Sequence, residues 1–234
     1  MSLAVEADGS LITVAGFAGN YQVYRIDPVS GLRTRVPTEG PAFRFPTDVA
    51  LAPDGTLMVI DIGYPAVFQI NLETGTRLIL SSDTMGIGPL LGPVSSLAVD
   101  PTGAIFAGSF FTILQIDALS GNRSVVSGGV LTPDIVIFLP EGLAVETMDT
   151  LVMVDSLTTR VTRVDLLSGL ATVISDDGIG LGPSLFFPVA IAVEADGMLV
   201  VTDITLRALI RIDPLTGDRM MLSGPRPEVS LETK

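Results

Sequence analysis

The sequence contains no cysteine, no histidine and no tryptophan. Without cysteine there is no disulfide bond, no thiol nucleophile and no thiolate metal site. Without histidine the chain lacks the commonest general base and the commonest transition-metal ligand, which excludes a Ser-His-Asp triad. The absences therefore exclude the most familiar nucleophilic and thiolate sites.

Positive charge and long hydrophobic runs are also scarce. The net charge is -13 and the sequence pI is about 4.2. A surface this acidic repels phosphate, so nucleic acid and anionic membranes are poor partners. The longest apolar run, Leu185 to Val193, is interrupted by Pro188 and is too short to span a bilayer. Met1 to Glu6 lacks the basic and apolar regions of a signal peptide. These residues assign no compartment; export is the favoured expectation, with any signal peptide lying outside this sequence.

Apolar residues and turn formers are abundant. Hydrophobic residues make up 47% of the 234 residues, with 24 Gly and 16 Pro, which suits one large all-β domain with a sizeable core. The stretch from Phe187 to Gly224 shows the pattern most clearly. Turn signals at Asp196-Gly197 and at Asp213 to Gly217 separate its short apolar runs. The predicted strands are Ala190–Val193, Leu199–Thr202, Ala208–Ile212 and Arg219–Leu222.

This four-strand pattern recurs five times along the chain. Glycines that close the turn after the third strand are spaced by 44, 46, 48 and 48 residues, namely Gly31, Gly75, Gly121, Gly169 and Gly217. A period in the forties with four strands per unit predicts a β-propeller. We expect one domain over residues 1-225, with blades near 1-39, 40-83, 84-129, 130-177 and 178-225, and a loose tail over 226-234. Either the first blade packs on the fifth, or the chain is part of a propeller with six or more blades.

The repeat resembles the NHL and SMP-30/gluconolactonase-like propellers. The matching units are Pro-x-x-hydrophobic-Ala-hydrophobic, Asp-Gly, Val-x-Asp and Arg-Ile-Asp-x-x-Thr-Gly, and they cover the chain from Leu3 to about Gly224. The resemblance implies the fold more strongly than the function, because this repeat unit occurs throughout a broad superfamily. The virginiamycin-lyase-like propellers are also similar in repeat, but their chemistry needs a histidine.

Ligands of propellers are expected at the mouth of the central channel, where each inner strand begins. The candidates there are Asp48, Ser95 and Glu141. The resemblance to SMP-30-like enzymes implies acidic and Asn side chains that hold a divalent metal such as Ca²⁺ and polarise a lactone. No Asn lies at an inner-strand start, so that ligand set is incomplete. The alternative is that Asp48 and Glu141 are solvated or bond to the backbone.

A second acidic series ends the second strand of three repeats: Asp61, Asp155 and Asp203. Because these residues recur, we interpret them as structural acceptors for backbone N–H groups of the following turn. Catalytic residues should break the repeat. The departures are the apolar insert from Thr132 to Leu139 and the glycine-rich loops from Met85 to Gly92 and from Gly178 to Pro183. We expect Tyr21, Tyr64, Phe110 and Phe111 on a rim between second and third strands.

The function that these features favour is a non-catalytic scaffold that binds a protein, a peptide or a small ligand. The alternative from a different class is an SMP-30-like, divalent-metal-dependent hydrolase, lactonase or lyase with its site around Glu141 and Asp48. The sequence predicts no cofactor beyond that divalent cation.

Overall fold

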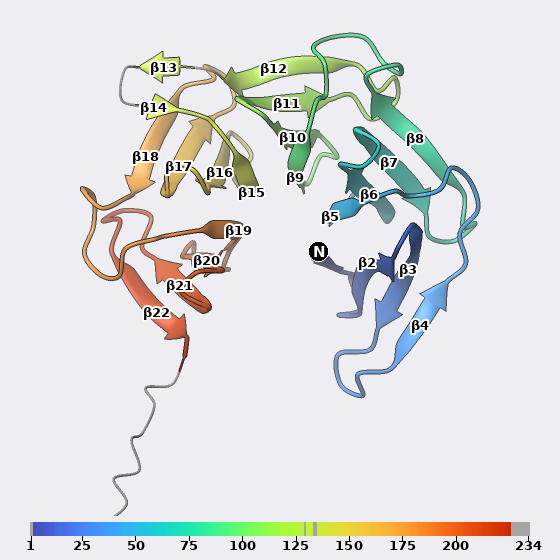
Figure 1. Ribbon diagram of the computed structural model, residues 1–234, viewed down its shortest axis with the longest axis horizontal. Coiled ribbons are helices and arrows are strands. Elements are labelled where there is room, and N and C mark those ends of the chain that lie inside the picture. The colour runs from blue at the N-terminus through green and yellow to red at the C-terminus, as the bar shows by residue number, and fades with distance from the viewer. Residues whose placement is uncertain (1, 129, 133–134, 226–234) are drawn as a thin grey trace, which may run out of the picture.

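The computed structural model describes residues 2–128, 130–132 and 135–225. These residues form five four-stranded antiparallel sheets arranged around a common centre and one two-stranded sheet (Figure 1). The predicted all-β, five-bladed propeller is confirmed. The described residues contain no helix, and therefore none long and apolar enough to cross a membrane. The predicted tail over 226-234 lies outside the described residues.

Each blade is contiguous in sequence and runs from an inner to an outer strand. The first blade comprises β1 (Leu3–Val5), β2 (Leu11–Phe17), β3 (Asn20–Ile26) and β4 (Arg33–Val36); the second, β5 (Pro46–Leu51), β6 (Thr56–Asp61), β7 (Ala66–Asn71) and β8 (Arg77–Ser82); the third, β9 (Val94–Val99), β10 (Ile105–Ser109), β11 (Thr112–Ile116) and β12 (Arg123–Gly128). The fourth comprises β15 (Pro140–Thr147), β16 (Thr150–Asp155), β17 (Arg160–Asp165) and β18 (Ala171–Ser175); the fifth, β19 (Pro188–Val193), β20 (Leu199–Asp203), β21 (Ala208–Ile212) and β22 (Arg219–Ser223). The hairpin of β13 (Val130–Thr132) and β14 (Ile135–Val136) lies between the third and fourth blades.

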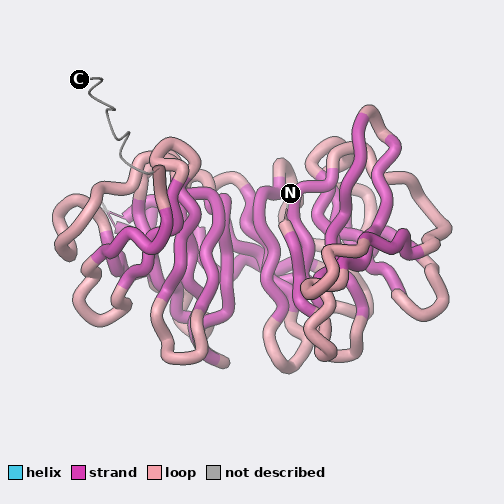
Figure 2. The backbone as a smooth tube through the Cα atoms, turned by 90° about the horizontal axis from the view of Figure 1, so that it is seen from below, coloured by secondary structure: helices cyan, strands magenta, loops and turns pink. Residues whose placement is uncertain are grey.

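The inner strands contact one another in the order β1, β5, β9, β15 and β19. Within the described part of the chain, β1 and β19 are not packed on each other as the other neighbours are. Figure 1 accordingly shows an opening between the first and the fifth blade, and Figure 2 shows the same arrangement from its edge, with loops on both faces. Of the two expected arrangements, the described structure is therefore not the one in which the first blade packs on the fifth.

Apolar contact between successive blades forms the core. Strand alternation sends Leu57 and Val59 of β6 toward the first blade, and Met58 and Ile60 toward the third. Two further clusters of buried side chains join the third blade to the fourth and the fourth to the fifth. Every interior blade thus buries both of its faces, which explains why its strands read as nearly continuous apolar runs.

Hydrogen bonds at the rim join the outer strand of one blade to the next blade. A serine near the end of each of three outer strands donates its hydroxyl hydrogen to a turn-glycine carbonyl in the following blade. These pairs are Ser81 with Gly121 at 2.8 Å, Ser127 with Gly169 at 2.7 Å, and Ser175 with Gly217 at 2.7 Å. The serine side chains are almost fully buried. We call each serine–glycine contact, with the arginine described next, a rim joint.

A buried arginine completes two of the rim joints. The Arg123 guanidinium donates to the Ser81 hydroxyl at 2.7 Å and to the carbonyls of Ser82, Met85 and Pro89 at 2.8, 2.7 and 2.6 Å. Arg219 repeats this pattern with Ser175, Asp176, Ile179 and Pro183. The two glycine-rich loops therefore cross between blades, as expected, and each folds around an arginine of the blade that it leads into.

The turns between third and fourth strands end in exposed apolar side chains. Before each turn, a side-chain oxygen of an Asp or Asn residue accepts backbone N–H groups within the turn. Asp117, for example, accepts from Leu119 and Ser120. The residues at the tips are more than nine-tenths exposed in four blades: Val29, Leu119, Leu167 and Leu215. The turn conformation thus depends on the flanking residues and not on the tip.

We predict that Arg123→Met lowers the free energy of unfolding by about 3 kcal/mol, because it leaves several buried oxygen acceptors without a donor. The loop from Met85 to Gly92 should also become a chymotrypsin site. Thermal unfolding and limited proteolysis measure the two effects. The matched control is Arg33→Met, since Arg33 has the same register in the first blade but is exposed. Equal effects of the two substitutions would contradict the role given to the rim joint.

Candidate functional site

The predicted channel-mouth residues occupy equivalent positions at the starts of inner strands. Sheet register places Asp48, Ser96 and Gly142 at one position and, one residue earlier, Thr47, Ser95 and Glu141 at another. The register shifts by one residue at this point in all three blades, so both positions follow a local irregularity. The structure therefore brings Asp48, Ser95 and Glu141 to the same end of the channel.

Asp48 links the second blade to the third. One carboxylate oxygen accepts the backbone N–H of Val49 at 2.9 Å, and the other accepts that of Leu97 at 2.7 Å. Burial raises the pKa of Asp48, while hydrogen bonds from Ser2, Leu97 and Val49 act in the opposite direction. Both oxygens of this carboxylate are thus engaged by backbone groups.

Ser95 and Ser96 link the third blade to the fourth. Their hydroxyl groups both donate to the carbonyl oxygen of Pro140, at 2.8 Å and 2.5 Å. At the next junction the position of Ser96 is taken by Gly142, where a Cβ would lie only 2.7 Å from Cα of Ala190, so no side chain fits at that position. The predicted ligand residue Ser95 therefore has its hydroxyl hydrogen committed to a contact between blades.

Glu141 differs from Asp48, Ser95 and Ser96. Its side chain is partly buried and has no hydrogen-bond partner among the described residues, although its backbone N–H donates to the Leu139 carbonyl at 2.9 Å. Its pKa is raised by burial first and by the negative charge of Asp155 second. Ser156, which follows Asp155 directly, is 4% exposed and its hydroxyl has no partner in the described part of the chain. The buried hydroxyl of Thr47, at the position equivalent to Glu141 in the second blade, also has no partner in this part of the chain, so the mouth has two unpaired buried hydroxyl groups besides the Glu141 carboxylate.

The acids that end the second strands are fully buried acceptors of backbone N–H groups. Asp61 accepts from Arg44 and Phe45, before the inner strand, and from Gly63 and Tyr64, in the next turn, at 2.6 to 3.0 Å. The equivalent donors are Phe138, Leu139, Leu157 and Thr158 for Asp155, and Phe186, Phe187 and Leu206 for Asp203. Each carboxylate therefore fixes the connection into its inner strand.

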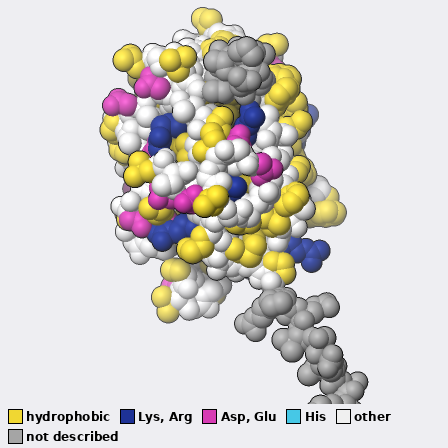
Figure 3. Space-filling view, turned by 90° about the vertical axis from the view of Figure 1, so that its left-hand side faces the viewer, with side chains coloured by type: hydrophobic (Ala, Val, Ile, Leu, Met, Phe, Trp, Pro, Cys, Tyr) yellow, Lys and Arg dark blue, Asp and Glu magenta, His cyan; other side chains and the backbone are white. Residues whose placement is uncertain are grey.

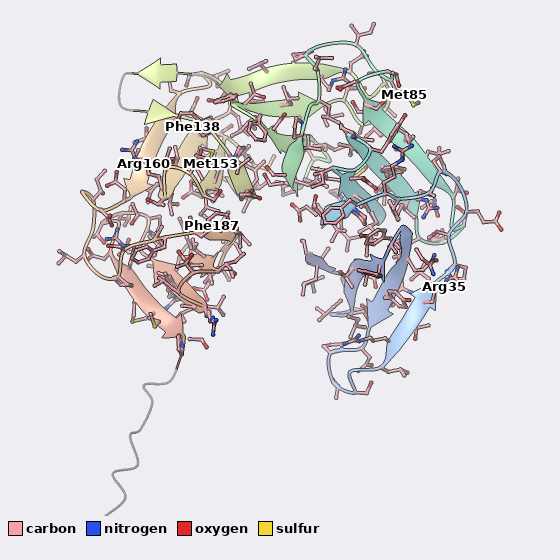
Figure 4. The ribbon with its side chains drawn as sticks, viewed as in Figure 1. Arg35, Met85, Phe138, Met153, Arg160 and Phe187 are labelled. Atoms are coloured by element: carbon pink, nitrogen blue, oxygen red, sulfur yellow. The ribbon has the colours of Figure 1, made fainter. Side chains whose placement is uncertain are left out.

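An aromatic cluster extends over the third and fourth blades. The rings of Phe110 and Phe111 are 5.8 Å apart, those of Phe111 and Phe138 are 5.4 Å apart, and all three side chains are exposed. The Phe111 N–H also donates to the Phe138 carbonyl at 3.1 Å. Phe138 lies on the connection into β15, as Phe187 lies on that into β19 (Figure 4). We call Phe110, Phe111 and Phe138 the aromatic cluster.

The two tyrosines predicted for the same rim behave differently. Tyr21 is buried and packs edge-on against Phe45, with ring centres 6.4 Å apart. Tyr64 is partly buried, and the Arg44 guanidinium lies 5.4 Å from the centre of its ring. The sequence identified Phe110 and Phe111 as rim residues but did not single out Phe138, although Phe138 belongs to the insert that breaks the repeat.

The opposite end of the channel contains an apolar hollow of about 480 Å³. Its walls include three residues that are equivalent by register near the ends of inner strands, Leu51, Val99 and Val145. The acids beside it are engaged, because Asp100 accepts from Thr102 and Ala104, and Glu146 pairs with Arg163. Sequence reasoning missed this hollow; its signal was the aliphatic residue that ends each inner-strand motif.

The described residues contain no group of three or more Asp or Glu side chains close enough together to hold a metal ion. Glu141 is the one predicted mouth ligand whose side chain has no partner there, since those of Asp48 and Ser95 are engaged. The metal role of the three residues stays a prediction.

Known structures with the same fold have different functions. No protein-family model and no curated protein matches the chain. A chain of a nidogen/laminin complex matches with a TM-score of 0.73 and 19% identity over 94% of this chain and 78% of that one. Virginiamycin B lyase from Staphylococcus aureus matches with a TM-score of 0.68 and 17% identity, covering 94% and 68%. A streptogramin B lyase matches with a TM-score of 0.70 and 15% identity, covering 97% and 69%.

These neighbours are β-propellers, and at such low identity they show the fold alone. One complex and two lyases among them do not indicate one activity. Membership of the NHL or SMP-30-like families stays a prediction. A histidine-to-alanine variant of the Staphylococcus aureus lyase is described as catalytically inactive, and the present chain has no histidine.

We predict that Glu141→Gln stabilises the protein at about pH 7. The raised pKa means that the folded state disfavours the ionised carboxylate, so ionisation costs stability above the folded pKa. The advantage of the variant should shrink as the pH falls through the folded pKa and vanish below the ordinary value of 4.5. Thermal unfolding over this pH range measures it, with the exposed Glu73→Gln as control. A variant no more stable than wild type at neutral pH would contradict the burial of Glu141.

We also predict that Ca²⁺ at about 1 mM, a concentration that fills weak extracellular sites, does not raise the melting temperature. The reason is that Glu141 is the one predicted ligand with a carboxylate not already engaged. Differential scanning fluorimetry with Ca²⁺, Mg²⁺, Mn²⁺ and Zn²⁺ provides the measurement. Stabilisation by a divalent cation that Glu141→Gln abolishes would support the metal-dependent alternative instead.

Proposed function

We propose that the protein is a non-catalytic scaffold that binds a peptide segment of a partner protein at the aromatic cluster and Glu141. The observation that carries this proposal is the contact of three exposed phenylalanine rings across two blades. Aromatic side chains are enriched at protein interfaces, and buried aromatic anchors provide much of the binding free energy. The proposed site is where the fourth copy departs from the repeat.

Electrostatics favour a partner with positive charge. The chain has a net charge of -13, which attracts cationic segments over a distance of about one Debye length. The Glu141 side chain lacks a partner in the described structure, and salt screens an ion pair of a partly buried carboxylate with Lys or Arg less than it screens an exposed pair. We therefore propose a ligand that combines an apolar side chain with a nearby Lys or Arg. The outer surface of the fourth and fifth blades, in contrast, mixes acidic, basic and apolar side chains (Figure 3).

Backbone strain at Phe111 does not by itself support the proposal. Phe111 has a φ of 62°, which is unfavourable for a bulky residue. However, Thr159 and Arg207 adopt similar values, 55° and 52°, in the equivalent turns of the fourth and fifth blades. The strain therefore belongs to the repeated turn. Among the described residues, an aromatic contact between blades is found at the turns of the first and third blades, Tyr21 with Phe45 and Phe111 with Phe138, and not at those of the fourth and fifth. This difference provides a matched control.

We predict that Phe111→Gly combined with Phe138→Ala weakens peptide binding at least tenfold, while the fold persists because glycine tolerates positive φ. The probe is a random heptapeptide library selected on the wild-type protein, followed by biolayer interferometry of the enriched peptides. The control combines Arg207→Gly with Phe186→Ala, which changes the equivalent positions of the fifth blade. Enriched peptides should contain Lys or Arg, and Glu141→Gln should reduce that preference.

Two outcomes would overturn the proposal. One is the absence of any enriched peptide, and the other is equal binding to the wild-type protein and the cluster variant. Circular dichroism of the variant establishes that lost binding does not come from unfolding.

A further inference from the structure

The first blade has a sheet face that no other blade covers. The inner-strand position of Leu3 corresponds by register to Val49, Leu97, Leu143 and Ile191. Those four side chains are 4 to 9% exposed, whereas Leu3 is 55% exposed. Val5, two residues along on the same face, is 60% exposed. The first blade thus carries the apolar residues of an interface between blades without its partner.

The fifth blade has the complementary uncovered face. The third-strand position of Leu209 corresponds to Val23, Val67, Ile113 and Val161. All four counterparts are 0% exposed, and Leu209 is 40% exposed. Leu222 of the outer strand is 45% exposed, whereas its counterparts Leu80 and Ile174 are each 6% exposed. The two sides of the opening are therefore the two halves of the interface that recurs inside the molecule.

The polar half of the interface is present at the opening as well. Arg33 has the register of the rim-joint arginines Arg123 and Arg219, yet it is exposed. Ser223 has the register of the rim-joint serines and is also exposed, whereas Ser81, Ser127 and Ser175 are 0 to 3% exposed. Each end of the arc thus keeps a hydrogen-bonding group whose counterparts are engaged at interior junctions.

We propose that the opening is a docking site for one further four-stranded β-blade of this repeat, presented by another polypeptide segment. Such a blade would cover Leu3 and Val5 with one face and Leu209 and Leu222 with the other. A serine at the end of its outer strand and the loop that follows would accept the Arg33 guanidinium. A turn glycine before its own outer strand would offer a carbonyl oxygen to the Ser223 hydroxyl.

A single blade fits this opening better than a second copy of the protein. A second copy could place its own first blade, with Leu3 and Arg33, against the fifth blade of the original copy. Its four remaining blades would then have to continue the arc through the space that the first blade of the original copy occupies (Figure 1). A lone blade fills both faces at once without that overlap. The longer propellers with the same fold leave part of their chains, about a fifth to a third, without a counterpart here, which is room for at least one blade.

The test supplies a sixth blade to the full chain. A second copy of residues 178-225 is inserted directly after residue 225, so that its own arginine, serine and turn glycine complete both rim joints. We expect the melting temperature to rise by at least about 5 °C, since several apolar side chains become buried. Binding of the dye bis-ANS, which reports exposed apolar surface, should fall at least threefold.

The matched variant combines Leu3→Glu and Val5→Glu. In the five-bladed chain these positions are exposed, so the melting temperature should change little. In the six-bladed chain the same substitutions should remove most of the gain, because the added blade would have to bury two carboxylates. No gain from the sixth blade, or an equal effect of the two glutamates in both chains, would overturn the proposal. A five-bladed chain that forms dimers or longer assemblies in light scattering, and becomes monomeric with the two glutamates, would overturn it in favour of a second copy.

Discussion

The structure depends on one repeated contact, that between a blade and its successor. Apolar side chains from both faces interlock near the channel, and at the rim a buried serine donates to the carbonyl of a turn in the next blade. Arg123 and Arg219 add donors for the carbonyls of the glycine-rich loops. Because neither part forms within a single sheet, an isolated blade would expose both apolar faces, and an isolated third or fifth blade would also leave its arginine without acceptors. Stability in such an array accumulates junction by junction.

The same requirement decides which polar residues are free for binding. Asp48 and Ser95 face the channel mouth, yet their side chains join neighbouring blades, and Asp61, Asp155 and Asp203 fix the connections into the inner strands. The repeated acids therefore have a structural role in each of the three blades that contain one. Glu141 and Ser156 lie where the repeat has changed, and their side-chain oxygen atoms have no hydrogen-bond partner in the described part of the chain. Departure from the repeat separates candidate binding groups from structural ones.

Much of the fold could be predicted from the sequence because its rules are local. Turns such as Asp213 to Gly217 and the spacing of their glycines fix the strands and the number of blades. The partners of Ser95 could not be predicted, since a hydroxyl group in a channel mouth can face solvent or a carbonyl with the same sequence. Tyr21 was expected on the rim but is buried against Phe45, which lies on the connection into the second blade, and a contact between blades of this kind cannot be inferred from the repeat alone. Phe138 contacts Phe111 of the preceding blade, and the repeat does not predict this contact because the equivalent residue of the second blade is Arg44.

The exposed apolar tips of the third turns have a consequence for engineering. In four blades a Val or Leu protrudes almost fully, while an Asp before it and a Gly after it hold the turn, as Asp117 and Gly121 do around Leu119. A short loop exchanged for such a tip would leave every strand and rim joint intact. Since the tips belong to different blades of one rigid array, the same graft repeated at each of them would display several copies at fixed spacing. The rim could therefore present several copies of a grafted binding loop, and the spacing between the turns would set the avidity of their combined binding.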